Sequence, residues 1–278
     1  MMNAIVARGL GDFHLEEVPI PEVGNGDILV KVGAAGVCAA DRMIFKGNAP
    51  WKTLPFPFIP GHEFIGTIVD IGKEAKKQTG LEIGDKAIAE LGIPCRNCYY
   101  CHRGMYHLCD NLKAIGGTLN GGWAEYLLYP SGSIVHRVNK TVADEIAVFT
   151  EPLANAIHGI ELANLGFQDI LVIAGGGAIG MGMLQIALYK HPQKIILLDV
   201  QEEIRKTALA IGADYSMDPR DNTTVQELVN SLTNGRGCDV FIEASGAPSS
   251  IQFGLELCRK AGRLVVFGVY SKNSEIDA

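Results

Sequence analysis

The sequence lacks the features that mark membrane, secreted and nucleic-acid-binding proteins. No apolar run reaches the roughly 18 residues that a membrane-spanning helix needs. Met1–Glu17 contains no basic stretch followed by a long apolar one, which excludes a signal peptide. No Lys/Arg stripe is present and the formal net charge is −7, so nucleic acid is not an expected partner. We therefore expect a cytoplasmic protein with neither a membrane nor a nucleic-acid partner.

The remaining composition is that of an ordinary globular protein. The chain has 278 residues, of which 47% are hydrophobic and 20% are charged. At about 150 residues per domain, this length predicts two domains. Seven cysteines in a chain without a secretion signal favour metal ligands and core thiols over disulfides. Two of them, Cys238 and Cys258, adjoin apolar segments and are expected in the core.

Two halves of different character are predicted, residues 1–150 and 151–278. The first half has short β-branched segments separated by Gly, Pro and Asn turns, which predicts an antiparallel, barrel-like β domain with little helix before residue 141. The second half alternates apolar strands with helices, which predicts a doubly wound parallel sheet. The expected strands are Ala4–Ala7, His14–Val18, Asp27–Val32, Phe64–Asp70, Lys86–Glu90, Ala124–Tyr129, Asp169–Ala174, Lys194–Leu198, Asp239–Ala244, Arg263–Gly268 and a weak Asp214–Met217. The expected helices are Asp144–Val148, Pro152–Leu165, Met181–Tyr189, Gln201–Ile211, Thr224–Leu232 and Ile251–Lys260.

A glycine-rich turn joins the first expected strand and helix of the second half. Gly175, Gly177 and Gly180 form G-x-G-x-x-G, which allows a tight turn, approach of the backbone to a pyrophosphate, and close helix–strand contact. The helix amino terminus then offers free N–H groups to the anion. The residues expected to hold the dinucleotide phosphates are Gly175, Gly177, Ala178, Ile179 and Gly180.

A carboxylate in the expected place beyond this turn indicates which dinucleotide is bound. Asp199 ends the next expected strand, where it accepts hydrogen bonds from the adenosine ribose. No Lys or Arg follows it before Arg205, so a ribose phosphate would be repelled. The pattern favours NAD over NADP.

Four closely spaced cysteines predict a structural zinc site. Two-residue gaps allow a turn to direct successive sulfurs at one ion, and the fourth thiolate completes a tetrahedron. His102 and His107 lie within the same segment and are expected outside the ligand set. The predicted ligands are Cys95, Cys98, Cys101 and Cys109.

A second group of potential ligands comes from two loops of the first half. Cys38, His62 and Glu63 supply a thiolate, an imidazole and a carboxylate, which suit a catalytic zinc that keeps one position open. Asp41 is expected to accept the second ring N–H of His62. Glu151, at the joint between the halves, is a further candidate ligand, and zinc has room for only one of the two glutamates beside a water or substrate.

These motifs together resemble the zinc-dependent medium-chain dehydrogenases over essentially the whole chain and in the same order. The Glu151-Pro152-Leu153 joint resembles the polyol (sorbitol-type) and threonine branches. The segments Asn120–Tyr126 and Ile134–Val138 look most like erythritol/threitol-type enzymes.

The resemblance implies a GroES-like catalytic domain, a Rossmann domain, and NAD-linked oxidation of a secondary alcohol to a ketone by a homo-oligomer, dimeric or tetrameric when full length. In that chemistry zinc lowers the pKa of the substrate hydroxyl, and the carbon passes hydride to the nicotinamide. The same resemblance places four further residues near the nicotinamide: Ser245, Gly246, Gly268 and Val269.

Two departures from the family pattern qualify that expectation. Ala40 stands where members often carry a hydroxyl that relays the departing proton, so we expect Glu63, or a zinc-bound water near Glu151, to take it. The chain also stops at Ala278, whereas the family continues into a sixth sheet strand. A shortened chain with an exposed sheet edge, lowered stability and a disturbed oligomer interface is expected.

The sequence leaves three functions open. The leading one is a polyol dehydrogenase. The second is a threonine-type or other secondary alcohol dehydrogenase, for which no residue to hold the substrate ammonium or carboxylate is evident. The third is a nucleotide-binding protein without turnover, suggested by Ala40 and the short carboxyl terminus.

Overall fold

The structure, a computed structural model, describes residues 1–49, 54–270 and 276. It divides into two compact units, Met1–Glu151 and Pro152–Ala278, and the expected boundary differs from this division by one residue. Each unit has a hydrophobic core of its own. None of the helices in the described part of the chain combines the length and apolarity needed to cross a membrane.

An antiparallel five-stranded sheet forms the centre of the N-terminal unit, in the order β8-β3-β4-β5-β9. A hairpin and a two-residue pair accompany it, which confirms the β-rich prediction for this half. The sheet strands are β3 (Ile28–Ala35), β4 (Phe64–Ile71), β5 (Lys86–Ala89), β8 (Tyr126–Tyr129) and β9 (Val135–Val138). The others are β1 (Met2–Gly9), β2 (Asp12–Val18), β6 (Gly92–Ile93) and β7 (Lys113–Ala114).

The core of this unit is built by the inward residues of these strands. Phe64, Ile65 and Ile68 of β4 are each at most 1% exposed. Tyr129 at the end of β8 is fully buried, and its hydroxyl donates to the carbonyl of Ala87 at 3.1 Å. That bond compensates for burying the hydroxyl. The sheet is therefore a firm platform for the loops at its ends.

Helices in the N-terminal unit are short. Two α-helices of seven residues each, α1 and α2, lie before residue 141, where little helix was expected. Seven residues give fewer than two turns, too few for a periodic apolar pattern. The first begins with Cys38 as N-cap, whose backbone N–H donates to the Asp41 carboxylate at 2.9 Å. The helical segments are α1 (Ala39–Phe45), α2 (Lys73–Thr79), η1 (Cys101–Arg103), η2 (Tyr106–Leu108) and α3 (Asp144–Ala147).

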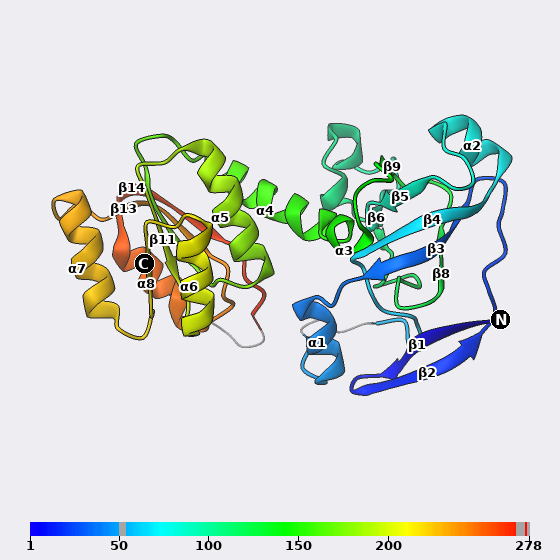
Figure 1. Ribbon diagram of the computed structural model, residues 1–278, viewed down its shortest axis with the longest axis horizontal. Coiled ribbons are helices and arrows are strands. Elements are labelled where there is room, and N and C mark those ends of the chain that lie inside the picture. Colours follow the sequence, from blue (N-terminus) through cyan, green and yellow to red (C-terminus); the bar gives the residue numbers. More distant parts are fainter. Residues whose placement is uncertain (50–53, 271–275, 277–278) are drawn as a thin grey trace. The chain divides into compact units, whose positions relative to one another are not determined.

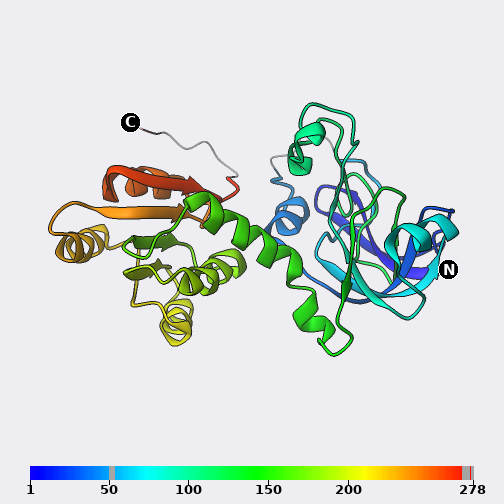
Figure 2. The ribbon, with the colours of Figure 1, turned by 90° about the horizontal axis from the view of Figure 1, so that it is seen from above.

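A parallel five-stranded sheet forms the C-terminal unit, in the order β12-β11-β10-β13-β14. Helices cover both of its faces (Figures 1 and 2), which confirms the predicted doubly wound fold. The strands are β10 (Ile170–Ala174), β11 (Lys194–Leu198), β12 (Tyr215–Met217), β13 (Cys238–Glu243) and β14 (Cys258–Val266). The helices are α4 (Thr150–Ala163), α5 (Ala178–Lys190), α6 (Glu202–Ile211), α7 (Asn222–Thr233) and α8 (Pro248–Leu257).

Alternate residues of the central strand β10 serve the two faces. Leu171 and Ile173 join the core formed with α4, α5 and α6, whereas Ile170 and Val172 join the core formed with α7 and α8. All four are at most 2% exposed. Because both faces are covered, the strand is a continuous apolar run, as expected for a parallel sheet.

The junction of α8 and β14 differs from the sequence prediction. The helix was expected over Ile251–Lys260 and the strand from Arg263, but the helix ends at Leu257 and the strand begins at Cys258. Cys258 pairs with Cys238 of β13, and the pairing then skips to Val240 with Arg263. Pairing across the sheet therefore ends the helix earlier than its apolar pattern predicts.

Candidate functional site

The ends of two paired strands bring together the residues expected to form a catalytic metal site. Ala35 at the end of β3 lies opposite Phe64 at the start of β4. The residues just beyond these ends, Cys38 on one side and His62 and Glu63 on the other, therefore lie close together. Their potential ligand atoms all lie within 4.8 Å of one another.

A small residue is needed where the Glu63 side chain lies. Gly36 donates its backbone N–H to the carbonyl of Glu63 at 2.9 Å, and a Cβ on Gly36 would overlap a carboxylate oxygen of Glu63. The indole N–H of Trp123 donates to the carbonyl of Gly36 at 2.9 Å, which holds this segment in place. Sequence reasoning did not identify Gly36, because its role depends on the pairing of two strands.

Asp41 lies beside the cluster and is 1% exposed, but the hydrogen bond expected from the His62 ring is not formed. One carboxylate oxygen accepts the Cys38 N–H, while the other has no hydrogen-bond partner and lies 3.7 Å from Nδ1 of His62. The buried carboxylate faces Nδ1, the ring nitrogen that stays free when the metal binds through Nε2. It is therefore placed to select the tautomer of His62.

The electrostatics of the cluster suit a cation. Burial raises the pKa of the Cys38 thiol to about 11, and the nearby Glu63 and Asp41 charges act in the same direction. Burial also raises the pKa of Glu63, to which the charge of Glu151 contributes. Anionic forms are thus disfavoured until a positive charge enters, which is the effect that a bound divalent metal supplies.

A cavity of about 360 Å³ opens beside this cluster. Asp41, His62 and Glu151 line it, and the rest of its wall is mainly apolar. Glu151 therefore lies at the cavity, although among the described residues the close ligand group contains only Cys38, His62 and Glu63. Further lining residues are Ala40, Ile44, Leu54, Leu91, Ala114, Ile115, Gly116, Gly117 and Thr118.

The four-cysteine segment forms a compact second group. The sulfurs of Cys95, Cys98, Cys101 and Cys109 lie within 4.8 Å of one another, whereas the exposed His102 and His107 lie outside this set. The backbone N–H of Cys95 donates to the sulfur of Cys109 at 3.2 Å. Four converging sulfurs match the tetrahedral thiolate set of a structural zinc.

Backbone amides favour the thiolate form in this segment. The N–H of Asn97 contributes most to lowering the pKa of Cys95, to about 6, and the N–H of Cys101 contributes most to lowering the pKa of Cys98. Deprotonated sulfurs are the form that binds metal. Burial raises the pKa of Cys101 to about 12, so the backbone amides prepare Cys95 and Cys98, but not Cys101, for an ion.

The glycine turn has the geometry predicted for it. Gly175 has a φ of +104°, and a Cβ there would lie 2.7 Å from the backbone nitrogen of Ser245. A Cβ on Gly180 would overlap the carbonyl oxygen of Gly175, whereas one on Gly177 would meet nothing within 4 Å. The α5 helix begins at Ala178, so the N–H groups of Ala178 and Ile179 lie in its first turn. The open side of the turn is therefore free for a phosphate.

Asp199 is tied to the turn by its own carboxylate. Its two oxygens accept the N–H of Gly176 and the N–H of Gln201, each at 2.8 Å. Arg205 donates to the backbone carbonyl of Asp199 at 2.8 Å and lies 3.6 Å from the carboxylate of Asp218. Asp218 pairs more closely with Arg220, at 2.5 Å, so the hydrogen bond to the Asp199 carbonyl is the shorter contact of Arg205.

The residues expected near a nicotinamide cluster around a carboxylate that the sequence prediction missed. Glu243, at the end of β13, is fully buried and accepts the N–H groups of Ser245 and Gly246 at 2.8 and 2.9 Å. Its backbone carbonyl accepts the N–H of Gly268, and a Cβ on Gly246 would lie 2.8 Å from the carbonyl of Val269. The sequence did contain a signal for Glu243, because it ends an apolar strand. A charged residue in such a place is rarely buried unless it is hydrogen-bonded or paired.

Two family models match the chain. "Alcohol dehydrogenase GroES-like domain" matches residues 24–140, and "Zinc-binding dehydrogenase" matches residues 178–278.

The chain is also similar to characterised proteins along most of its length. It is 36% identical to erythritol/L-threitol dehydrogenase of Mycolicibacterium smegmatis, covering 99% of this chain and 78% of that protein. It is 35% identical to L-threonine 3-dehydrogenase of Pyrococcus horikoshii, covering 95% and 74%. A zinc-binding dehydrogenase structure from Sinorhizobium meliloti, bound to NADP, superposes with a TM-score of 0.92 at 31% identity, covering 100% of this chain and 80% of that one.

Proposed function

The chain belongs to the zinc-dependent medium-chain dehydrogenase family, and we propose that it oxidises a secondary hydroxyl of a sugar alcohol to a ketone with NAD as the hydride acceptor. The observation that carries this proposal is the cluster of Cys38, His62 and Glu63 beside a cavity with a largely apolar wall. One thiolate, one imidazole and one carboxylate leave a position for the substrate hydroxyl.

The residues of the cluster have separate tasks in this proposal. Cys38, His62 and Glu63 would hold the zinc, and Asp41 keeps the His62 ring in the tautomer that binds through Nε2. Zinc supplies a Lewis acid that lowers the pKa of the substrate hydroxyl. Glu151 is the alternative carboxylate ligand, and otherwise it accepts hydrogen bonds from substrate hydroxyls at the cavity wall.

The cavity wall favours a polyol over threonine. None of the described residues that line it is Lys or Arg, so the carboxylate of threonine would meet no guanidinium or ammonium there. Asp41 and Glu151 place two carboxyl groups in the same wall. These groups would accept hydrogen bonds from polyol hydroxyls and from the threonine ammonium alike, so the preference rests on the lack of a cation for the threonine carboxylate.

The proton released from the substrate hydroxyl needs an acceptor from this chain. Ala40 lines the cavity and offers no hydroxyl for a relay. Glu63 belongs to the cluster and Glu151 lines its cavity; burial raises the pKa of Glu63 when no metal is bound, so a Glu63 that has left the metal to Glu151 is a stronger base than an exposed glutamate. We assign proton acceptance to Glu63, with Glu151 as the alternative.

The preference for NAD rests on Asp199. Its carboxylate is fixed by two backbone N–H groups, and a phosphate on the adenosine ribose would be repelled by it. Asp218, which lies 3.6 Å from Arg205, also pairs with Arg220 at 2.5 Å, so the preference is carried by the Asp199 carboxylate and not by neutralisation of Arg205. Titrating the protein with NAD and with NADP tests this preference, and tighter binding of NADP would contradict it.

One experiment separates the candidate functions. Zinc per chain is measured, and reduction of the nicotinamide is followed with erythritol, threitol, sorbitol and threonine. Two zinc ions per chain and turnover of the four-carbon polyols support the proposal. Faster turnover of threonine would replace it with the amino-alcohol function, and dinucleotide binding without turnover of any alcohol would indicate a binding protein. Cys38→Ser serves as the control, because it should lose turnover while keeping one zinc.

A further inference from the structure

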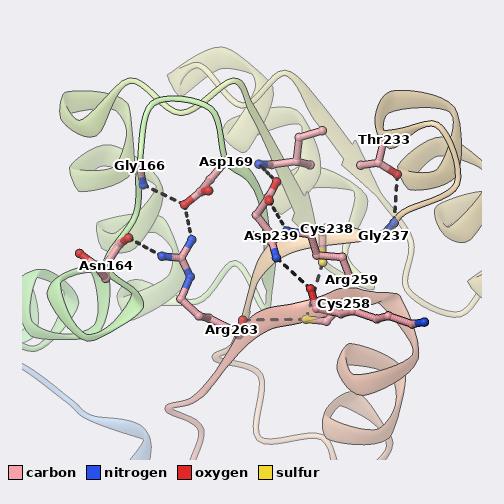
Figure 3. Close-up of polar contacts among 12 residues, drawn as sticks. Asn164, Gly166, Asp169, Thr233, Gly237, Cys238, Asp239, Cys258, Arg259 and Arg263 are labelled. Atoms are coloured by element: carbon pink, nitrogen blue, oxygen red, sulfur yellow. Dashed lines mark hydrogen bonds and ion pairs between the residues drawn. The ribbon is translucent and has the colours of Figure 1, made fainter.

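Two cysteines of the C-terminal unit, which belong to neither metal-ligand group, lie in contact at the amino ends of neighbouring strands. Cys238 begins β13 and is fully buried, and Cys258 begins β14 and is partly exposed. They are register partners in the parallel pairing, and their sulfurs lie 3.9 Å apart (Figure 3). The contact thus joins two segments separated by α8.

The backbone holds the two cysteines close together. Gly237 has a φ of +92°, and a Cβ there would lie 2.6 Å from the carbonyl oxygen of Leu257 and 2.8 Å from the nitrogen of Arg259. Its N–H donates at 3.1 Å to the buried hydroxyl of Thr233. Only glycine permits so close an approach, and the approach sets the spacing of the sulfurs.

Ion pairs next to the cysteines reinforce this geometry. Nε of Arg259 donates to the Asp239 carboxylate at 2.6 Å, and the other oxygen of Asp239 accepts the N–H of Ile170 in the central strand at 2.8 Å. Figure 3 shows Arg259 and Asp239 beside the two cysteines, and Arg263 paired with Asp169 at the same edge. The residue that follows each cysteine is therefore bonded across the sheet.

The contact makes the two thiols unequal. The S–H of Cys238 donates to the sulfur of Cys258, which raises the pKa of Cys238 and lowers that of Cys258. The guanidinium of Arg259 further lowers the pKa of Cys258. Cys258 is thus both the more exposed cysteine and the better thiolate, and the thiolate is the reactive form.

We propose that Cys238 and Cys258 are a redox-modifiable dithiol that a peroxide converts reversibly into a disulfide. The Cys258 thiolate attacks one oxygen of hydrogen peroxide, the O–O bond breaks, and the departing hydroxide takes a proton to become water. The Cys238 thiol then attacks the sulfenic sulfur of Cys258, the S–O bond breaks, and a second water leaves. Two thiols and one peroxide therefore give one disulfide and two waters.

Formation of the bond requires only a local movement. A disulfide is about 2.05 Å long, so the sulfurs, which lie 3.9 Å apart, must approach by roughly 2 Å. The bond closes a loop that contains α8 and the Ser245–Gly246 segment. It lies at the amino edge of the sheet, whereas the glycine turn follows the carboxyl end of β10. Oxidation should therefore stabilise this unit without blocking the dinucleotide site.

The sequence allows a site-specific test. No Lys or Arg lies between the two cysteines, so trypsin releases both in one peptide, Gly237–Arg259. The zinc-loaded full chain is treated with hydrogen peroxide, and its free thiols are alkylated. The protein is then digested with trypsin, and the peptide masses are measured by mass spectrometry. We expect this peptide without alkylation and lighter by two hydrogens than its reduced form. Dithiothreitol should reduce the disulfide and restore both thiols. The midpoint of thermal unfolding should rise by on the order of 5–10 °C.

Cys258→Ser is the matched control, and zinc is counted before and after oxidation to detect damage to the other thiols. In the variant, Cys238 should be alkylated and the midpoint should not rise. The proposal is wrong if the peptide stays doubly alkylated while other cysteines of the chain are oxidised. It is also wrong if Cys258 goes to the sulfinic acid without forming the bond, or if the variant shows the same rise in the midpoint.

Discussion

Asp41→Asn should selectively weaken binding of the catalytic zinc and leave binding of the four-cysteine zinc unchanged. Asp41 is 1% exposed and serves two partners at once, the backbone N–H of Cys38 at 2.9 Å and the His62 ring at 3.7 Å. The asparagine oxygen can still accept from Cys38, so the start of α1 should persist. The amide NH₂ then faces Nδ1 of His62 and favours the tautomer with its proton on Nε2, the nitrogen needed for the metal.

The magnitude follows from the loss of this single orienting contact. Loss of a carboxylate that orients a metal-binding histidine weakens the metal by about 10- to 100-fold, or about 1.4–2.8 kcal/mol. The assay is competition with a chelator, with the two zinc ions resolved by their rates of release. The affinity for the catalytic zinc should fall by that factor, and turnover should fall with it. The release rate of the four-cysteine zinc should stay unchanged.

A matched variant separates orientation from general loss of stability. Asp144→Asn removes another carboxylate of the same unit, one that pairs with Lys86 at 2.6 Å away from the cluster. It should leave both zinc ions and turnover unaltered. If Asp41→Asn retains both zinc ions with wild-type release rates and turnover, Asp41 does not orient His62 and the assignment is wrong.

Three further outcomes are expected. Glu63→Gln should lose zinc and turnover together, whereas Glu151→Gln should keep the zinc and chiefly raise KM for the polyol; the reverse pattern in zinc counts would make Glu151 the ligand. Asp199→Asn should weaken NAD binding and lower the ratio of kcat/KM with NAD to kcat/KM with NADP by about tenfold or more. An unchanged ratio would contradict the role of this carboxylate. Asp85→Asn should lower the unfolding midpoint at neutral pH but not at a pH below the lowered pKa of Asp85. The N–H of Glu82 contributes most to lowering the pKa of Asp85, so its stabilisation is present above the usual value of 3.8 and is lost as pH falls through the lowered one. Equal effects at both pH values would refute this.

Strands buried on both faces were predictable from the sequence because their apolar runs are unambiguous. The strand expected at Lys194–Leu198 has the same bounds as β11. Short or cross-paired elements were not predictable. The seven-residue α1 lacks a periodic pattern, and the end of α8 is set by pairing of Cys258 with Cys238, which local propensity does not contain.

The same division applies to the functional residues. Residue type and spacing indicated the ligands Cys38, His62 and Glu63, because few other combinations suit a metal, and the structure brings these three together. The roles of Gly36 and Glu243 depend on which strand ends are adjacent, and that information appears only once the sheets are formed. Spacing along the chain thus predicts which atoms bind, whereas register predicts which atoms hold them in place.

The presence of two glutamates near one metal cluster has a physical consequence. Glu63 is held by the β3–β4 pairing through Gly36, so its carboxylate stays beside Cys38 and His62. Glu151 lies on α4 and lines the cavity, and its charge helps to raise the pKa of Glu63. Beside Cys38 and His62, a four-coordinate divalent ion that also keeps a position open has room for only one of these carboxylates. The strand-anchored carboxylate is the better fixed ligand, which leaves the helix-borne one to contact substrate or to take its place when Glu63 accepts a proton.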